Sequence, residues 1–230
     1  MKVLKIEQNS EEWREFRIGK ITGSGAKSVK PLSRGSDRTP TGFWQLLAGR
    51  LAIRQDGEDP KDRGHRLENI ALDEFSTAYG LKIEKEAGVW VSDKDENIMF
   101  SPDGAEPGDT PTYSAEVKCL SSDKHIKYMV KDIMAKKLKD YNPIYSIPDE
   151  QGAYYRDQAV QAFVVGDTIK THHFIFYDDR MAYEQMKLYV ISINREHVLD
   201  LIEKANQDQA ETWLGVKKMI SFLFRELGIK

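Results

Sequence analysis

Two short segments carry acidic and basic side chains whose types and spacing suit metal-dependent chemistry. Asp103 lies in Ser-Pro-Asp-Gly, and Glu116-Val117-Lys118 follows thirteen residues later. Side chains alternate along a strand, so Glu116 and Lys118 are expected on one face and Val117 on the other. Two converging carboxylates suit a hard divalent cation such as Mg²⁺, whose remaining ligands are water and phosphate oxygens. An ammonium beside them can orient a water molecule whose pKa the metal lowers.

Each segment alone also has an ordinary explanation. A Glu-x-Lys pair on a strand is usually a surface pair, and Asp-Gly after a strand is usually a turn. The combination is more selective, because a strand, Pro-Asp-Gly, a short loop, a strand with Glu-x-Lys and a basic helix follow one another. If the two strands pair as a hairpin, Asp103 reaches the same place as Glu116. We therefore expect a metal site between them.

Hydrophobic periodicity predicts the elements that must position these residues. Helices are expected over residues 43–53, 65–79, 124–138 and 154–165, with further helices over 197–227. Strands are expected over 85–91, 98–101, 113–119, 173–177 and 188–193. Helices mixed with strands in this order predict an α/β or α+β fold with a central mixed sheet flanked by helices. No stretch resembles a linker, so a single domain over residues 1–230 is expected.

Composition excludes several other classes of protein. The chain has 230 residues, of which 40% are hydrophobic and 31% charged, as in an ordinary globular protein. Its only cysteine, Cys119, excludes an internal disulfide and a metal cluster held by several thiolates, and it is expected to pack as a small apolar residue. The polar N-terminus does not resemble a signal peptide, and no apolar run approaches the roughly 20 residues that span a bilayer. A cytoplasmic location without membrane contact is expected.

Charge is unevenly distributed, which bears on a nucleic-acid partner. The net charge is −3, whereas a duplex favours a basic surface. Residues 1–38 nevertheless carry nine Lys and Arg against five Asp and Glu, and residues 117–139 carry seven Lys against two Asp. Such segments can form a local positive surface for DNA. Solvated lysines on an exposed helix are the alternative.

Three further segments complete a pattern with a known counterpart. They are Trp13-x3-Arg17-x-Gly19-x-Ile21-Thr22-Gly23-Ser24, Gly64-x3-Glu68 and Tyr155-x2-Gln158. With Pro-Asp and Glu-x-Lys, the chain resembles the PD-(D/E)xK nuclease superfamily, in particular the phage lambda exonuclease and YqaJ-type viral recombinase family. The resemblance covers nearly the whole chain and implies a restriction-endonuclease-like fold. One departure is Gln161, because the family often has Gln-x-Gln where this chain has Gln-Ala-Val-Gln, and the role of the second glutamine stays open.

The resemblance implies a Mg²⁺-dependent 5′→3′ exonuclease on double-stranded DNA with free ends. Such an enzyme releases mononucleotides and leaves 3′ single strands for recombination by an annealing protein. The family works as a ring-shaped homotrimer with two metal ions per site, for which Mn²⁺ can substitute. A phage or prophage origin in a bacterial host is implied as well. Two other functions remain open, a structure-specific or restriction-type endonuclease on the same fold and a DNA-binding module without catalysis.

The resemblance also implies a role for each matching residue. Asp103, Glu116 and the backbone carbonyl of Val117 bind metal, and Glu68 approaches it directly or through water. Lys118 and Gln158 position the attacking water. By itself, Glu68 in a first helical turn could equally be a favourable charge at the helix dipole.

A pocket for the 5′-terminal phosphate is implied at Arg17, Ser24 and Ser101. An arginine fork and hydroxyl groups suit a phosphate chemically. A helix-surface arginine and a capping serine are the alternatives. Possible DNA contacts on the basic segments are Arg34, Arg38, Lys124 and Lys131.

The histidines fit a metal site less well. His172 and His173 are neighbours on a strand, so their rings should point to opposite faces rather than share a metal. His65 and His125 are expected to be exposed to solvent.

Overall fold

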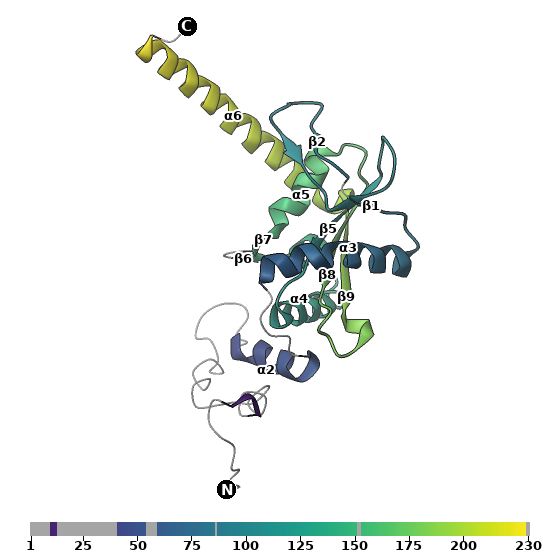
Figure 1. Ribbon diagram of the computed structural model, residues 1–230. Helices are drawn as coiled ribbons and strands as arrows, with labels where there is room; N and C mark the ends of the chain where they lie inside the picture. Colours follow the sequence, from purple (N-terminus) through teal and green to yellow (C-terminus); the bar gives the residue numbers. More distant parts are fainter. Residues whose placement is uncertain (1–9, 13–40, 54–58, 86, 151–152, 229–230) are drawn as a thin grey trace. The chain divides into compact units, whose positions relative to one another are not determined.

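The computed structural model describes residues 10–12, 41–53, 59–85, 87–150 and 153–228 (Figure 1). The chain divides into two compact units. Unit 1 comprises Met1–Tyr79, Val117–Tyr141 and Ile175–Val190, and unit 2 comprises Gly80–Glu116, Asn142–Phe174 and Ile191–Lys230. The expectation of one domain stays a prediction. None of the described helices combines the length and the apolar character needed to cross a membrane.

A five-stranded sheet runs through unit 2, and each of its strands contributes residues to that unit. Its strands in spatial order are β1 (Glu84–Lys85), β4 (Gly104–Ala105), β5 (Tyr113–Lys118), β8 (Thr171–Tyr177) and β9 (Leu188–Asn194). Strand β4 pairs antiparallel with both β1 and β5. The strand β4, only two residues long, was not expected from the sequence.

Strands β5 and β8 run parallel, which makes the sheet mixed. The amides of Lys170 and Thr171, at the start of β8, both donate to the carbonyl of Thr112 at the start of β5. The two strands therefore begin together. At the other side of β8, the amide of Arg195, just after β9, donates to the carbonyl of Lys170, so β9 runs back antiparallel. The predicted mixed sheet flanked by helices is confirmed.

The strand expected over residues 85–91 is wrong, because its two ends belong to different sheets. β1 joins the large sheet, whereas β2 (Trp90–Val91) pairs with β3 (Met99–Phe100) in a separate two-stranded sheet. Gly88 lies between them with φ of 78°, a left-handed conformation that glycine adopts without strain and that ends the extended backbone. A second small sheet joins β6 (Asp149–Glu150) and β7 (Ala153–Tyr154).

Helix α5 (Tyr155–Val165) covers the face of the large sheet that carries Ser114 and Glu116. Phe163 of α5 lies against His172 of β8 with 6.1 Å between ring centroids. Unit 2 is completed by the 3-10 turns η1 (Pro143–Ser146) and η3 (Arg195–Val198) and by α6 (Leu199–Leu227). The C-terminal region, expected as several helices, is thus a 3-10 turn followed by one long helix (Figure 1).

Unit 1 holds α2 (Thr41–Leu51), α3 (Pro60–Tyr79), α4 (Ser122–Ala135) and the 3-10 turn η2 (Glu184–Met186). Trp44 of α2, Ile126 of α4 and Met181 form a buried cluster. Helix α3 begins five residues before its predicted start at residue 65. Pro60 accounts for the difference, because proline suits the first helical position, where its missing amide hydrogen leaves no intrahelical bond unmade.

The buried face of α4 is rotated from the predicted one. The helical spacing of Ile126, Met129, Val130, Ile133 and Met134 predicts that these five side chains face inward. Ile133 and Met134 do not, because their exposed fractions are 44% and 63%. Instead His125 and Asp132 are fully buried, so the expectation of an exposed His125 is wrong. The Nε2 atom of His125 lies 2.8 Å from the carbonyl oxygen of Met186, and burial lowers the pKa of this histidine. The spacing of apolar residues does not reveal the buried face of α4, because this face includes the polar residues His125 and Asp132, which are buried with hydrogen-bonding partners. His65 is exposed, as expected.

The neighbouring histidines of β8 point to opposite faces and bind different partners, as predicted. The Nδ1 atom of His172 lies 2.9 Å from the hydroxyl of Ser114, and that of His173 lies 2.9 Å from the hydroxyl of Ser192. The two rings therefore do not share a metal.

Burial of His173 predicts a loss of stability in mild acid. Burial lowers the pKa of His173 to about 4, so the unfolded chain, with a pKa of 6.5, takes up a proton first as the pH falls. The free energy of unfolding should therefore decrease between pH 6.5 and about 4, by up to about 3 kcal/mol from this group. Urea unfolding across this range should show a shallower pH dependence for His173→Gln. The exposed His65→Gln variant is the control, and equal slopes for both variants would contradict the assignment.

Candidate active site

The ladder between β4 and β5 brings Asp103 beside Glu116. Gly104 pairs with Ala115, and the backbone amide of Asp103 donates to the carbonyl of Ala115 at 3.1 Å. This bond to Ala115, the residue before Glu116, holds the backbone of Asp103 beside the same end of β5. The hairpin expected between residues 98–101 and 113–119 is wrong, because β3 pairs with β2, and β4 is the strand that pairs with β5 and positions Asp103.

The carboxylate of Glu116 is almost completely buried, with an exposed fraction of 2%. Its Oε1 atom accepts a hydrogen bond from the side-chain amide of Gln158 at 2.5 Å. Gln158 lies in the first turn of α5, 42 residues along the chain from its partner. An amide donor lessens the cost of burying a carboxylate but brings no charge to balance it. Within unit 2, two other residues predicted for the site, Asp103 and Gln158, therefore lie beside Glu116.

This donor set fits a hard cation. Asp103, half-buried, adds a second carboxylate next to the buried Glu116, and two carboxylates with water are a sufficient protein contribution for Mg²⁺. A cation between them would also relieve the repulsion of two neighbouring carboxylates. In the described parts of the chain, no three side chains of His, Cys, Asp or Glu are grouped to hold a metal. The fit of the site to a metal ion therefore depends on Asp103 and Glu116.

The other residues predicted for the site belong to unit 1. Lys118 is the last residue of β5 and is half-buried, and Val117 before it is buried. Glu68 is half-buried in α3. Because α3 begins at Pro60, Glu68 lies in the third turn rather than the first. The interaction with the helix dipole falls off within the first turn, so it does not explain a glutamate at this position.

Only part of the predicted phosphate pocket falls on described residues. Arg17 and Ser24 lie outside them, as do the possible DNA contacts Arg34 and Arg38. Ser101 is exposed, and its hydroxyl donates to the carbonyl of Gly88 at 3.2 Å.

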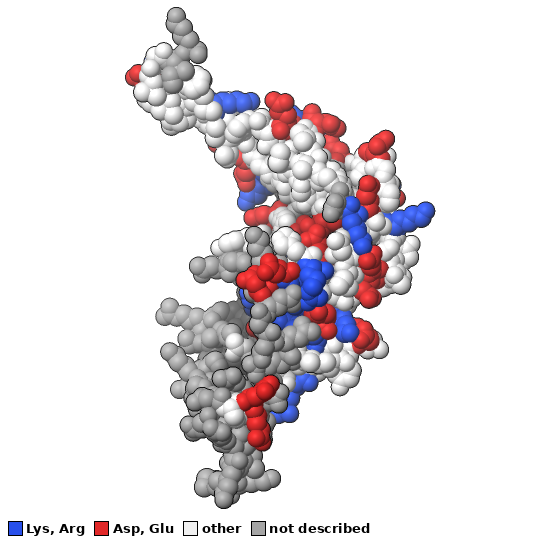
Figure 2. Space-filling view, viewed as in Figure 1, with Lys and Arg blue, Asp and Glu red and all other residues white. Residues whose placement is uncertain are grey.

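The basic segment after β5 forms α4, where Lys124 is exposed and Lys131 is half-buried. Over the described part of the face in Figure 2, lysine and arginine side chains lie among acidic ones. A basic surface made by α4 and by residues 1–38 stays a prediction, because most of residues 1–38 lie outside the described residues.

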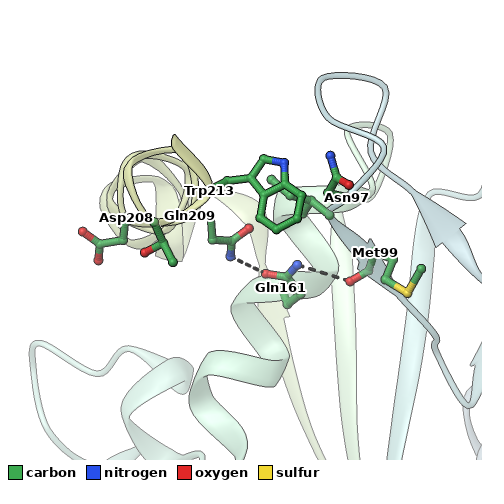
Figure 3. A pocket seen from close by; sticks show the side chains of 8 residues that line it. Asn97, Met99, Gln161, Asp208, Gln209 and Trp213 are labelled. Carbon is green, nitrogen blue, oxygen red and sulfur yellow. Dashed lines mark hydrogen bonds between the residues drawn. The ribbon is translucent and has the colours of Figure 1, made fainter. Parts of the chain in front are cut away.

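Gln161, whose role the sequence left open, does not contact Glu116 in the way that Gln158 does. Its amide nitrogen donates to the carbonyl of Met99 at 3.3 Å, and its oxygen accepts from the side chain of Gln209 at 2.7 Å (Figure 3). Gln161 thus joins α5 to β3 and α6, and lines a pocket of about 420 Å³ beside Trp213.

Cys119, directly after Lys118, is half-buried, and burial raises the pKa of its thiol to about 12. The thiol therefore stays protonated at neutral pH, which makes it a poor nucleophile. This agrees with the expectation that Cys119 packs rather than reacts.

Comparison with known proteins supports the family and the fold. The model of the YqaJ-like viral recombinase domain matches residues 12–146, more than half of the chain. An alkaline exonuclease from Laribacter hongkongensis, LHK-Exo, has a similar structure, with a TM-score of 0.54 and 23% identity over 95% of this chain and 98% of that one. Its complex with dAMP gives the same values. No curated protein matches the chain significantly in sequence.

Proposed function

The chain belongs to the YqaJ-like viral recombinase family, and from that premise we propose that it is a Mg²⁺-dependent exonuclease acting on double-stranded DNA. It digests each strand from the 5′ end, releases mononucleotides and leaves a 3′ single strand for an annealing protein. The observation that carries the proposal is the buried carboxylate of Glu116, with Asp103 beside it and the amide of Gln158 on its oxygen.

Each residue has a stated task in this proposal. Asp103, Glu116 and the carbonyl of Val117 would hold Mg²⁺, and Glu68 would contribute directly or through water. A metal held there would supply a water molecule of lowered pKa and positive charge for the scissile phosphate. Lys118 orients this water toward the phosphorus and balances charge that develops on the phosphoryl oxygens. Gln158 holds the Glu116 carboxylate in place through its amide hydrogen bond.

The remaining features rest on family membership and on the similar structure. LHK-Exo is an alkaline exonuclease and has been crystallised with dAMP, a mononucleotide, which supports release of mononucleotides by this chain too. The 5′→3′ direction, the ring-shaped homotrimer and the pocket of Arg17, Ser24 and Ser101 for a 5′-phosphate are proposed on the family resemblance.

Digestion of end-labelled DNA tests the proposal. On a linear duplex with 5′-phosphates and a different dye on the base of each 5′- and 3′-terminal nucleotide, we expect early loss of the 5′ labels as labelled mononucleotides. The 3′ labels should stay on long single strands. EDTA should stop the reaction, and covalently closed circular DNA should remain intact because it has no end. Cleavage of the closed circle would indicate an endonuclease, and DNA binding without any Mg²⁺-dependent cleavage would indicate a non-catalytic module.

A further inference from the structure

Unit 1 contains a buried network of ion pairs around Asp178, the residue that follows β8. Arg63, on the first turn of α3, is 5% exposed, and Asp178 is fully buried. One guanidinium nitrogen of Arg63 lies 2.7 Å from the carboxylates of both Asp178 and Asp179. The Nε atom of Arg180 lies 2.7 Å from Asp178 as well. Two arginines therefore enclose one buried carboxylate.

The same two arginines also bind the backbone directly after Lys118. The Nη1 atom of Arg63 donates to the carbonyls of Cys119 and Leu120 at 3.3 and 3.4 Å. The Nη2 atom of Arg180 donates to the carbonyl of Leu120 at 2.9 Å. The carbonyls of Cys119 and Leu120, between β5 and α4, are thus held by side chains from distant parts of the chain.

The network is charged and preorganised at neutral pH. Burial raises the pKa of Asp178, but hydrogen bonds from Arg180 and from Ser122, the first residue of α4, outweigh it, and the pKa lies below its ordinary value. A charged carboxylate that binds both arginines and the start of α4 fixes their relative positions. A planar guanidinium can make these several bonds at once, whereas an ammonium cannot.

We infer that Arg63 is a positioning residue for Lys118. By holding the carbonyls of Cys119 and Leu120, it fixes the end of β5 and hence the place from which the Lys118 ammonium group acts. Arg63 belongs to the same helix as Glu68, so one side chain ties the helix of one proposed site residue to the strand end of another. The inference rests on the proposed function, since it assigns Arg63 to the site proposed there.

The test variant is Arg63→Lys, because it keeps the buried positive charge and removes only the planar guanidinium group with its several N–H donors. Its matched control is Arg66→Lys, on the same helix, where the arginine is 46% exposed in its side chain and lies 3.6 Å from Asp179. We expect Arg63→Lys to lower kcat at least about tenfold, as small misplacements of catalytic groups do. KM and the Mg²⁺ concentration for half-maximal activity should stay unchanged, because Asp103 and Glu116 are intact. Arg66→Lys should retain wild-type kcat.

Hydrogen–deuterium exchange provides a readout that does not need activity. The amides of the segment after Lys118 should exchange at least about fivefold faster in folded Arg63→Lys than in the wild type or in Arg66→Lys, because local opening becomes easier. Unchanged exchange, or full kcat in the folded Arg63→Lys protein, would overturn the inference. If the wild type cleaves no DNA, the proposed function fails, whereas the exchange data still decide whether Arg63 holds this segment.

Discussion

Replacing Glu116 by glutamine should lower Mg²⁺-dependent DNA cleavage by about a thousandfold, equivalent to about 4 kcal/mol of transition-state stabilisation. Glutamine has the same shape, so the buried position is filled and the fold is kept. The variant loses the charge that, with Asp103, makes the site attractive to a divalent cation. The amide of Gln158 can still donate to the remaining oxygen at position 116. Duplex binding should survive, because phosphate contacts elsewhere supply most of the affinity.

Metal binding separates this explanation from a loss of folding. Calorimetric titration with Mn²⁺ should show much weaker binding to Glu116→Gln than to the wild type, with an unchanged circular dichroism spectrum. Glu84→Gln, which removes an exposed carboxylate from β1 of the same unit, is the control and should cleave DNA like the wild type. A Glu116→Gln protein with full Mg²⁺-dependent activity would remove Glu116 from the site.

Replacing Lys118 by alanine should lower kcat by about a hundred- to a thousandfold while metal binding is retained. The ammonium group acts on the water and on the developing charge, and a positioned group of this kind contributes about 10²–10⁴ in rate. Because Lys118 is not proposed as a ligand, Mn²⁺ titration should give the wild-type affinity. This result differs from that of Glu116→Gln, in which the metal itself is lost.

Single-turnover cleavage with enzyme in excess measures this effect on the chemical step. Lys139→Ala, an exposed lysine of the same basic segment, is the matched control and should cleave at the wild-type rate. If Lys118→Ala and Lys139→Ala were equally active, Lys118 would be a surface lysine of the kind that Glu-x-Lys motifs usually contain.

Much of the fold follows from local sequence patterns, and the exceptions have local causes. The helix α5 and the strands β5, β8 and β9 lie close to their predicted bounds, because each has a sustained hydrophobic period. The strand β4 has two residues, Gly104 and Ala105, and no period can be read from two residues. It exists because β1 and β5 pair with it on either side.

The local part of the proposed site can be predicted from the spacing of residues along the chain. Alternation along a strand predicts that Glu116 and Lys118 share a face, and the order of five motifs identifies the family. These properties depend on covalent spacing, so they can be read without a structure.

Contacts between residues far apart in the chain could not be predicted in this way. Gln158 and Gln161 are three positions apart on one helix, yet the first binds Glu116 and the second joins Met99 and Gln209. Arg63 meets Asp178 across 115 residues with no motif to indicate it. The physical reason is that such pairs depend on the rotation of a helix and the register of a sheet, which the packing of all elements sets together.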